Sequence, residues 1–315
     1  MNFRDRGINI DSGNKCTLEC AACARQQYKQ EGLSIPGKDL TLEQLDKLTD
    51  YFNRVSFCGT FSDPIFNPNF IEMLKLCKKK DIKTKISTAA SQRPEKWYDE
   101  AFKASSKKTT WIFGIDGLPK DSHKYRIHQK GEYLFNIMLK AVKQGLSVEW
   151  QCIVFDYNEN DIEEVKQLAK LHNIRLSLIY SARTDNGIKE VKKEKLNKIV
   201  YEITKPEDKK VFEPKCLKTK RELAWNNKGR VLPCCWLNTR YRTKYNEPII
   251  KTLFNDSLDM DNNDTVEDVI NSKEWTEFFN ILKTPTAEKP KKCLEMCSGP
   301  VNSNPEESKT TLWEE

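Results

Sequence analysis

The sequence predicts an α/β fold: a partial (β/α)6 barrel followed by a small C-terminal domain that contains a β-hairpin and helices. Two observations support this fold class. From residue 7 to about residue 180, short apolar runs alternate with amphipathic segments, as in a parallel sheet with helical crossovers. Over residues 184–215 the alternation weakens, and lysine becomes frequent while large apolar side chains become scarce. We therefore expect a barrel over residues 1–204, a second domain over 205–300 and a tail over 301–315.

The individual elements follow from the spacing of the apolar residues. Strands are expected over residues 7–11, 54–58, 82–88, 110–115, 147–155 and 174–180. Helices are expected over residues 41–52, 67–80, 94–104, 132–144 and 161–172, with a sixth over 191–204. Thr41 and Gln44 have the spacing of a capping box, and Asn67 before Pro68 is typical of a helix start. Residues 223–225 and 231–232 are apolar and flank the segment Asn226-Asn227-Lys228-Gly229, which predicts a hairpin.

Six β–α units in succession imply parallel strands joined by right-handed crossovers. Six units are too few for a closed eight-stranded barrel, so we expect an open, partial one. In such sheets the active site lies at the carboxyl ends of the strands.

The composition sets limits on location and partners. The formal charge of +7 comes from 53 basic and 46 acidic residues and is spread along the chain, which favours solvated helix faces over a nucleic-acid site. The same charge could also favour anionic substrates. No signal peptide or apolar run long enough for a membrane span is visible, so we expect a cytoplasmic protein with no membrane partner. Its 11 cysteines are then expected to be thiols, and eight of them fall in groups, which is typical of metal or cluster ligands.

Cys16, Cys20 and Cys23 form a C-x3-C-x2-C motif shortly after the first expected strand. Three thiolates at this spacing suit three corners of a [4Fe–4S] cube and leave the fourth iron without a protein ligand. A three-cysteine zinc site is the alternative, although zinc more often uses C-x2-C pairs. The position at the catalytic end of a strand favours the iron–sulfur interpretation.

This motif resembles the signature of the radical S-adenosylmethionine (SAM) superfamily. The resemblance implies that SAM binds the open iron and is cleaved reductively to a 5′-deoxyadenosyl radical, which abstracts a hydrogen atom from a substrate. It also implies a reducing partner such as flavodoxin or ferredoxin. The residue before the third cysteine is usually aromatic in this family, but here it is Ala22, so Tyr28 or a later residue is expected to hold the adenine.

Further segments at the strand ends resemble the same family. Ser62, Asp63 and Pro64 stand where Gly-Glu-Pro is usual, which implies that Asp63 binds the SAM amino group; a turn residue before proline is the alternative. Thr88 and Ser91 are the polar residues after the third strand. The segment 111–126 resembles a Ser-x-Asp-Gly…His-x-x-Arg segment, with Gly114 in place of the serine. This last match implies SAM or substrate contacts from Asp116, Arg126 and, more weakly, His123, while Gln151 and Arg183 are further candidates near the barrel mouth.

A second cysteine group resembles the SPASM and twitch extensions of that superfamily. Cys216, Gly229 and Cys234 have the pattern C-x12-G-x4-C, and Cys293 and Cys297 follow as C-x3-C. The resemblance implies one auxiliary [4Fe–4S] cluster held by Cys216, Cys234, Cys293 and Cys297, with Cys235 as a substitute for Cys234. A structural zinc site is the alternative.

The sequence thus predicts a radical SAM oxidoreductase or maturase, with a peptide or protein as the preferred substrate. A dehydrogenase or rearrangement enzyme for a small sugar-like or phosphorylated molecule is the second possibility. A zinc-binding or nucleic-acid-binding protein without catalytic activity is the third, but it leaves the Cys16 motif and Asp63 unexplained. The chain starts at its first strand, which lowers the expectation of a leader-binding domain before it.

Overall fold

The computed structural model describes residues 3–180, 211–218, 221–237, 247–299 and 309–312. The first part contains the expected strands and helices in the expected order, together with one short helix after the first strand that the sequence did not predict. The strands are β1 (Ile8–Ile10), β2 (Arg54–Phe57), β3 (Lys83–Thr88), β4 (Thr109–Gly114), β5 (Ser147–Val154) and β6 (Arg175–Tyr180). The helices are α1 (Ala24–Gln30), α2 (Leu42–Tyr51), α3 (Phe70–Lys79), α4 (Glu95–Ala104), α5 (Gly131–Lys143) and α6 (Ile162–Leu171). The expected helix over residues 191–204, the boundary at 204/205 and Arg183 lie outside the described residues.

The described part of the C-terminal region contributes short elements. These are β7 (Val211–Phe212), α8 (Lys215–Lys218), β8 (Leu223–Asn226), β9 (Arg230–Leu232), α9 (Pro248–Thr252), α10 (Val266–Ile270), α11 (Lys273–Lys283), α12 (Lys291–Cys297), β10 (Ser298–Gly299) and β11 (Lys309–Leu312). The hairpin expected from the Asn-Asn-Lys-Gly segment is β8–β9, and Gly229 supplies the positive φ of its turn (+89°).

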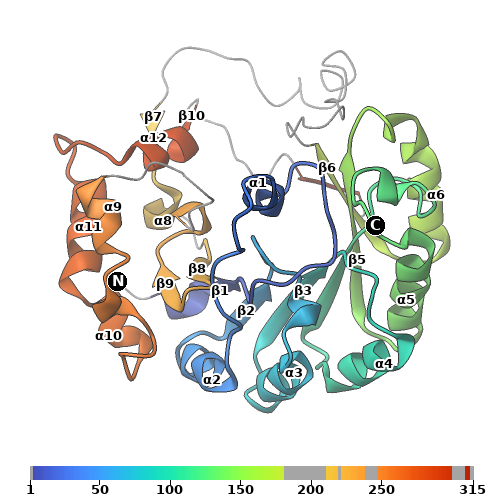
Figure 1. Ribbon diagram of the computed structural model, residues 1–315, viewed down its shortest axis with the longest axis horizontal. Coiled ribbons are helices and arrows are strands. Elements are labelled where there is room, and N and C mark those ends of the chain that lie inside the picture. Colours follow the sequence, from blue (N-terminus) through green and yellow to red (C-terminus); the bar gives the residue numbers. More distant parts are fainter. Residues whose placement is uncertain (1–2, 181–210, 219–220, 238–246, 300–308, 313–315) are drawn as a thin grey trace.

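One sheet combines strands from both regions, in the order β11-β6-β5-β4-β3-β2-β1-β8-β9. The pairs from β1 to β6 are parallel, and β8 joins the other edge of β1 as a parallel neighbour. The segment expected to be a tail contributes β11, which pairs antiparallel with β6. Figure 1 shows the curved sheet with α2 to α6 along its outer side and α9 to α12 beyond the β8–β9 hairpin. The predicted α/β fold with a parallel, partial-barrel sheet is confirmed.

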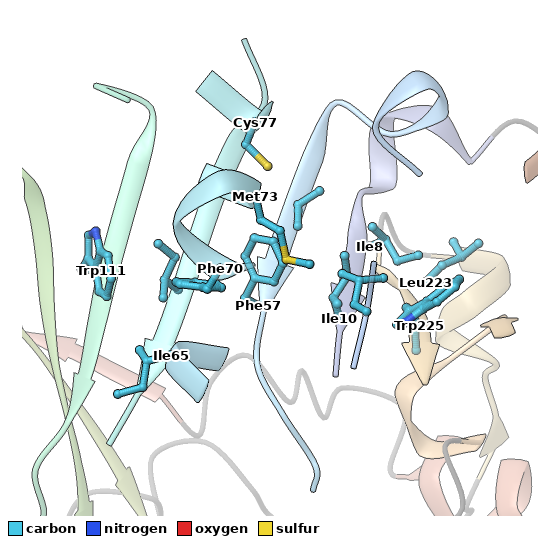
Figure 2. Packing of buried hydrophobic residues seen from close by; sticks show 14 of the residues in the cluster. Ile8, Ile10, Phe57, Ile65, Phe70, Met73, Cys77, Trp111, Leu223 and Trp225 are labelled. Atoms are coloured by element: carbon cyan, nitrogen blue, oxygen red, sulfur yellow. The ribbon is translucent and has the colours of Figure 1, made fainter. Parts of the chain in front are cut away.

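The main core lies between the outer face of the sheet and the helices. Phe57 of β2 contacts Phe70 of α3 with ring centroids 5.2 Å apart, and Phe70 also faces Trp111 of β4 (Figure 2). At the other end of the cluster, Ile8 and Ile10 lie beside Leu223 and Trp225 of β8. The C-terminal hairpin therefore shares the main core of the barrel. Burying a side chain of this size contributes about 1.5–3 kcal/mol to the stability of the folded chain.

The helix starts agree with the sequence in one case and differ in another. Thr41 and Gln44 form the expected capping box. The expected start of α3 at Asn67 is wrong, because the helix begins at Phe70. The side-chain amide of Asn67 instead donates to the carbonyl oxygens of Ser12 (2.8 Å) and Leu40 (3.0 Å). Asn67 therefore holds the loop after β1 against the segment before α2.

Candidate active site

Cys16, Cys20 and Cys23 lie in the loop that joins β1 to α1, at the carboxyl end of β1. All three thiols are partly accessible, and Cys23 is the residue that precedes the first turn of α1. Burial raises the pKa of Cys16 to about 12, and Asp63 adds to this; burial also raises the pKa of Cys20 to about 11. Both thiols are therefore protonated at neutral pH in the metal-free chain, and binding of a metal must displace their protons.

The cluster loop, residues 12–23, is fixed by its neighbours. The guanidinium of Arg25 donates to the carbonyl oxygens of Asn14 (2.5 Å) and Phe61 (2.6 Å), and at 3.4 Å to that of Cys16. The amide of Asp63 donates to the carbonyl oxygen of Lys15 at 2.9 Å. These bonds join the cluster loop to the segment that follows β2, so Arg25 is a structural residue of the site that the sequence did not single out.

Asp63 and Thr88 lie at the ends of β2 and β3, where the sequence placed them. The carboxylate of Asp63 is buried (6% exposed) and accepts hydrogen bonds from the amides of Ala89 (2.8 Å) and Ala90 (2.9 Å). It also accepts from the amide of Ile65 and from the hydroxyl of Thr88. Burial raises the pKa of Asp63, which these hydrogen bonds oppose. The carboxylate thus already has four protein donors, and direct contact with the SAM amino group stays a prediction.

Asp11 contacts the residues just before Asp63, and the sequence did not predict it as a site residue. Its carboxylate accepts hydrogen bonds from the hydroxyl of Ser62 (2.7 Å) and the amide of Phe61 (3.0 Å). Burial raises the pKa of Asp11 to about 6. Ser62, a predicted cofactor-binding residue, therefore holds the end of β1 in addition to any contact with a ligand.

Asp116 and Arg126 form a buried ion pair beyond β4. The Nε atom of Arg126 lies 2.8 Å from Asp116, which also accepts from the amide of Ile153 at 2.8 Å. Burial alone would lower the pKa of Arg126, but Asp116 and Cys20 raise it, so the guanidinium stays charged. Its positive charge in turn lowers the pKa of Cys20, against the larger effect of burial. The structure thus brings two predicted site residues beside one of the three cysteines.

Gly114 creates the space for this ion pair. A Cβ atom at Gly114 would lie 2.9 Å from a terminal nitrogen of Arg126 and 3.3 Å from the Cβ of Ala89. The amide of Gln129, also missed by the sequence reading, donates to the carbonyl oxygens of Gly114 (2.8 Å) and Ala89 (2.6 Å). The glycine and the alanine that replace family residues thus fit around Arg126.

The remaining predicted candidates have different surroundings. His123 is exposed in a short 3-10 helix. Ser91 is buried and accepts a hydrogen bond from the amide of Lys130, whereas Gln151 is partly accessible on β5. Tyr28 of α1 packs edge-on against Phe61, with ring centroids 5.6 Å apart. The roles of Gln151, Tyr28 and His123 stay predictions, and among these three His123 is the exposed one.

The C-terminal cysteines meet at a second place. A small pocket, partly open to solvent, is lined by Cys216, Cys234, Cys293 and Cys297. Arg221, Lys215 and Lys292 add positive charge to its wall. Burial raises the pKa of Cys216 to about 11 and that of Cys293 to about 12. Cys235 is exposed and does not line the pocket.

No three His, Cys, Asp or Glu side chains within the described ranges converge as the ligands of a single metal ion do. A [4Fe–4S] cube differs because each thiolate binds its own corner. The donor set fits the cube in its chemistry, with three thiols in one loop at the first site and four thiols around one pocket at the second.

Comparison with known proteins identifies the family. The sequence model of the radical SAM superfamily matches residues 10–172, just over half of the chain. This chain belongs to the radical SAM superfamily. The predicted family is thereby confirmed, and with it a [4Fe–4S] cluster and SAM as the cofactors that the fold implies. The SPASM or twitch assignment stays a prediction.

Individual relatives support the same family. A pyruvate formate-lyase-activating enzyme from Clostridium pasteurianum is 29% identical over 218 residues, which cover 60% of this chain and 87% of that protein. SuiB from Streptococcus suis has a similar fold, with a TM-score of 0.54 and 14% identity over 92% of this chain and 77% of SuiB. The enzyme anSMEcpe, solved with SAM and a peptide, has a TM-score of 0.55 at 14% identity, over 88% of this chain and 83% of its own.

None of the described helices is long and apolar enough to cross a membrane.

Proposed function

We propose that this protein is a radical SAM enzyme that abstracts a hydrogen atom from a peptide or protein and thereby oxidises or otherwise modifies it. The observation that carries the proposal is the position of Cys16, Cys20 and Cys23 at the carboxyl end of β1, with the charged Arg126 beside Cys20. When bound there, a [4Fe–4S] cluster and SAM supply the reductive cleavage that yields a 5′-deoxyadenosyl radical.

The residues of the chain would bind the cluster and orient SAM. Cys16, Cys20 and Cys23 would ligate the cluster. Arg126, held charged by Asp116, is suited to pair with the carboxylate of SAM. Asp63, Ser62 and Thr88 shape the strand ends around the same ligand, either directly or through the segments that they hold.

The second site supports an auxiliary [4Fe–4S] cluster with Cys216, Cys234, Cys293 and Cys297 as ligands. Four protein thiolates would leave no iron free for SAM, so such a cluster suits electron transfer from a substrate radical. Between the adjacent cysteines, the pocket favours Cys234 as the ligand, and the thiol of Cys235 forms a hydrogen bond with that of Cys234.

A polar substrate is supported by the inner face of the sheet. Asn9, Ser56, Lys85 and Thr110 lie in register across four strands on the face opposite the helices. Glu222 reaches over from the C-terminal region to accept a hydrogen bond from Ser56 at 2.7 Å. A peptide segment suits this face, and SuiB and anSMEcpe have each been solved with a peptide bound.

The same inner face also supports a second candidate, a dehydrogenase or rearrangement enzyme for a small sugar-like or phosphorylated molecule. Lys85 is exposed there, and no ion pair of it occurs among the described residues, so it could bind an anionic group. The two candidates share the chemistry at the first cluster and differ in what the inner face binds.

The test is anaerobic turnover of the iron-reconstituted protein with SAM and either dithionite or a flavodoxin or ferredoxin system. We expect slow formation of 5′-deoxyadenosine and methionine without substrate, and faster formation with a substrate. Deuterated peptides and deuterated sugars, tested separately, would show which class passes deuterium to 5′-deoxyadenosine. A protein with a full first cluster that forms no 5′-deoxyadenosine would contradict the proposal, and native zinc in place of iron would support the zinc-binding alternative.

A further inference from the structure

Asn227, in the turn of the β8–β9 hairpin, touches the loop that carries the first cysteines. Its side-chain amide donates to the carbonyl oxygens of Gly13 (3.0 Å) and Pro36 (2.8 Å), and its main-chain carbonyl oxygen accepts from the amide of Lys38 (2.8 Å). Asn227 is 2% exposed, so water cannot reach these groups to replace a hydrogen bond that is lost. One residue of the C-terminal region therefore holds the cluster loop 214 positions earlier in the sequence.

The fit around this amide leaves no room for alternatives. Gly37 has a φ of +94°, and a Cβ atom there would lie 2.3 Å from the Cγ of Asn227. The amide of Asn14 closes the same contact from the cluster loop by donating to the carbonyl oxygen of Gly37 at 2.9 Å. Asn227 is thus enclosed between two segments that must both keep their backbone positions.

The strand that leads into the cluster loop depends on the same hairpin. β1 has only three residues, Ile8–Ile10, and pairs with β8 along its full length. The amide of Asp11 continues this pairing by donating to the carbonyl oxygen of Trp225 at 3.1 Å. Without β8, this short strand would be an edge strand, and edge strands of this length are weakly fixed.

The hairpin also connects to the second cysteine site. Cys234 follows β9 by two residues and lines the C-terminal pocket, while Asn227 is at the opposite end of the same hairpin. A further contact lies beside the turn, where Asp261 bonds to the side chains of Lys38 and Gln44. The pocket and the cluster loop are therefore joined by one short, buried element.

We propose that Asn227 is a positioning residue for the first cluster: its side-chain amide holds Gly13 and Pro36, and with them the loop of Cys16, against the turn of the β8–β9 hairpin. The inference rests on the proposed role of Cys16, Cys20 and Cys23 as cluster ligands. It does not require that the C-terminal pocket holds iron, because the contacts of Asn227 are made by the polypeptide alone.

The test compares Asn227→Asp with a matched variant in the same turn. The aspartate is nearly isosteric but removes both donors and directs an oxygen at Gly13 and Pro36. The control is Asn226→Ala, which removes the acceptor for the amides of Lys228 and Arg230 and thus weakens the turn without touching the cluster loop. Asn227→Ser, which keeps one donor, serves if the aspartate variant does not fold.

The readouts are the electron paramagnetic resonance spectrum of the reduced protein with and without SAM, the SAM dissociation constant, and hydrogen exchange over residues 12–23. We expect Asn227→Asp to alter the spectrum of the first cluster, to weaken SAM binding about 10-fold and to speed exchange of the loop, with Asn227→Ser in between. Asn226→Ala should lower the melting temperature but keep the wild-type SAM affinity and spectrum.

Equal SAM affinity in wild type and Asn227→Asp, or an equal loss in both turn variants, would overturn the inference. The proposed function fails separately, if the wild-type protein shows no SAM-dependent cluster signal. In that case, hydrogen exchange over residues 12–23 still decides whether Asn227 holds the loop.

Discussion

The hydroxyl of Thr88 lies 2.9 Å from one carboxylate oxygen of Asp63 and 3.1 Å from the other. This contact joins the carboxyl ends of β2 and β3, and the amides of Ala89 and Ala90 extend it along the next two residues. The carboxylate therefore fixes the backbone that borders the first cysteine site. A direct role in SAM binding and a positioning role can be separated by changing each partner of the contact.

Asp63→Ala should weaken SAM binding by roughly 10-fold or more and destabilise the protein, because four protein donors lose their acceptor. Thr88→Val is the matched variant, since it removes the hydroxyl and keeps the carboxylate. If Asp63 binds the SAM amino group directly, Thr88→Val should keep near-wild-type affinity in isothermal titration calorimetry. If Asp63 acts by position, both variants should lose affinity. Wild-type affinity in Asp63→Ala would reduce Asp63 to a turn residue.

The sequence predicted the parts of this molecule that leave a local pattern. In strands such as β3, residues that pack under the helices alternate with polar residues on the inner face. The capping box of Thr41 and Gln44 lies within four consecutive residues. The cysteine motifs likewise have fixed spacings. Asp11 was not predicted as a site residue. A single aspartate at the end of a strand can be a buried hydrogen-bond acceptor or an exposed turn residue, and no sequence pattern around it distinguishes the two.

Long-range relations account for the rest. The parallel pairing of β8 with β1 joins residues more than 200 positions apart and leaves no local trace in either segment. Gly114 was recognised as a departure from the family pattern, but its reason, the space for Arg126, required the packed structure. Asn67 was expected to start a helix, whereas in the fold its amide binds two other loops.

The iron content tests the two sites together. Anaerobically reconstituted protein should hold about eight irons with matching sulfide, for two [4Fe–4S] clusters. Replacement of Cys16, Cys20 and Cys23 by alanine should leave about four irons. Colorimetric iron and sulfide assays with metal analysis measure both values. Replacing the buried Cys77, which packs in the core away from both sites, should leave the count at the wild-type level.

Asp11 predicts a pH dependence of stability. Burial raises its pKa to about 6, so the folded state binds the proton more tightly than the unfolded chain, whose pKa is near 4. Ionised Asp11 therefore costs stability above pH 6, and the cost disappears as the pH falls from 6 to 4. Relative to Asp11→Asn, the metal-free wild type should gain about 2 kcal/mol in its free energy of unfolding by urea between pH 7 and pH 4. A constant difference across this range would show that Asp11 has an ordinary pKa.

The C-terminal cysteines offer the sharpest separation of the two sites. If Cys293 and Cys297 ligate an auxiliary cluster, replacing both by alanine should abolish product formation and remove about four irons, while SAM cleavage without substrate continues at the first cluster. Cys235→Ala is the matched control, because Cys235 is exposed beside Cys234 but does not line the pocket, and it should keep the wild-type iron content.

The double variant would also lose the cross-link that a cluster provides in a region of short elements. Its melting temperature and its formation of 5′-deoxyadenosine without substrate must therefore be measured together. Retained SAM cleavage with lost product assigns the second site to the reaction of the substrate. Product formation at the wild-type rate would show that the second cluster has no part in it, and loss of SAM cleavage in a folded variant would show that the first cluster depends on the second site.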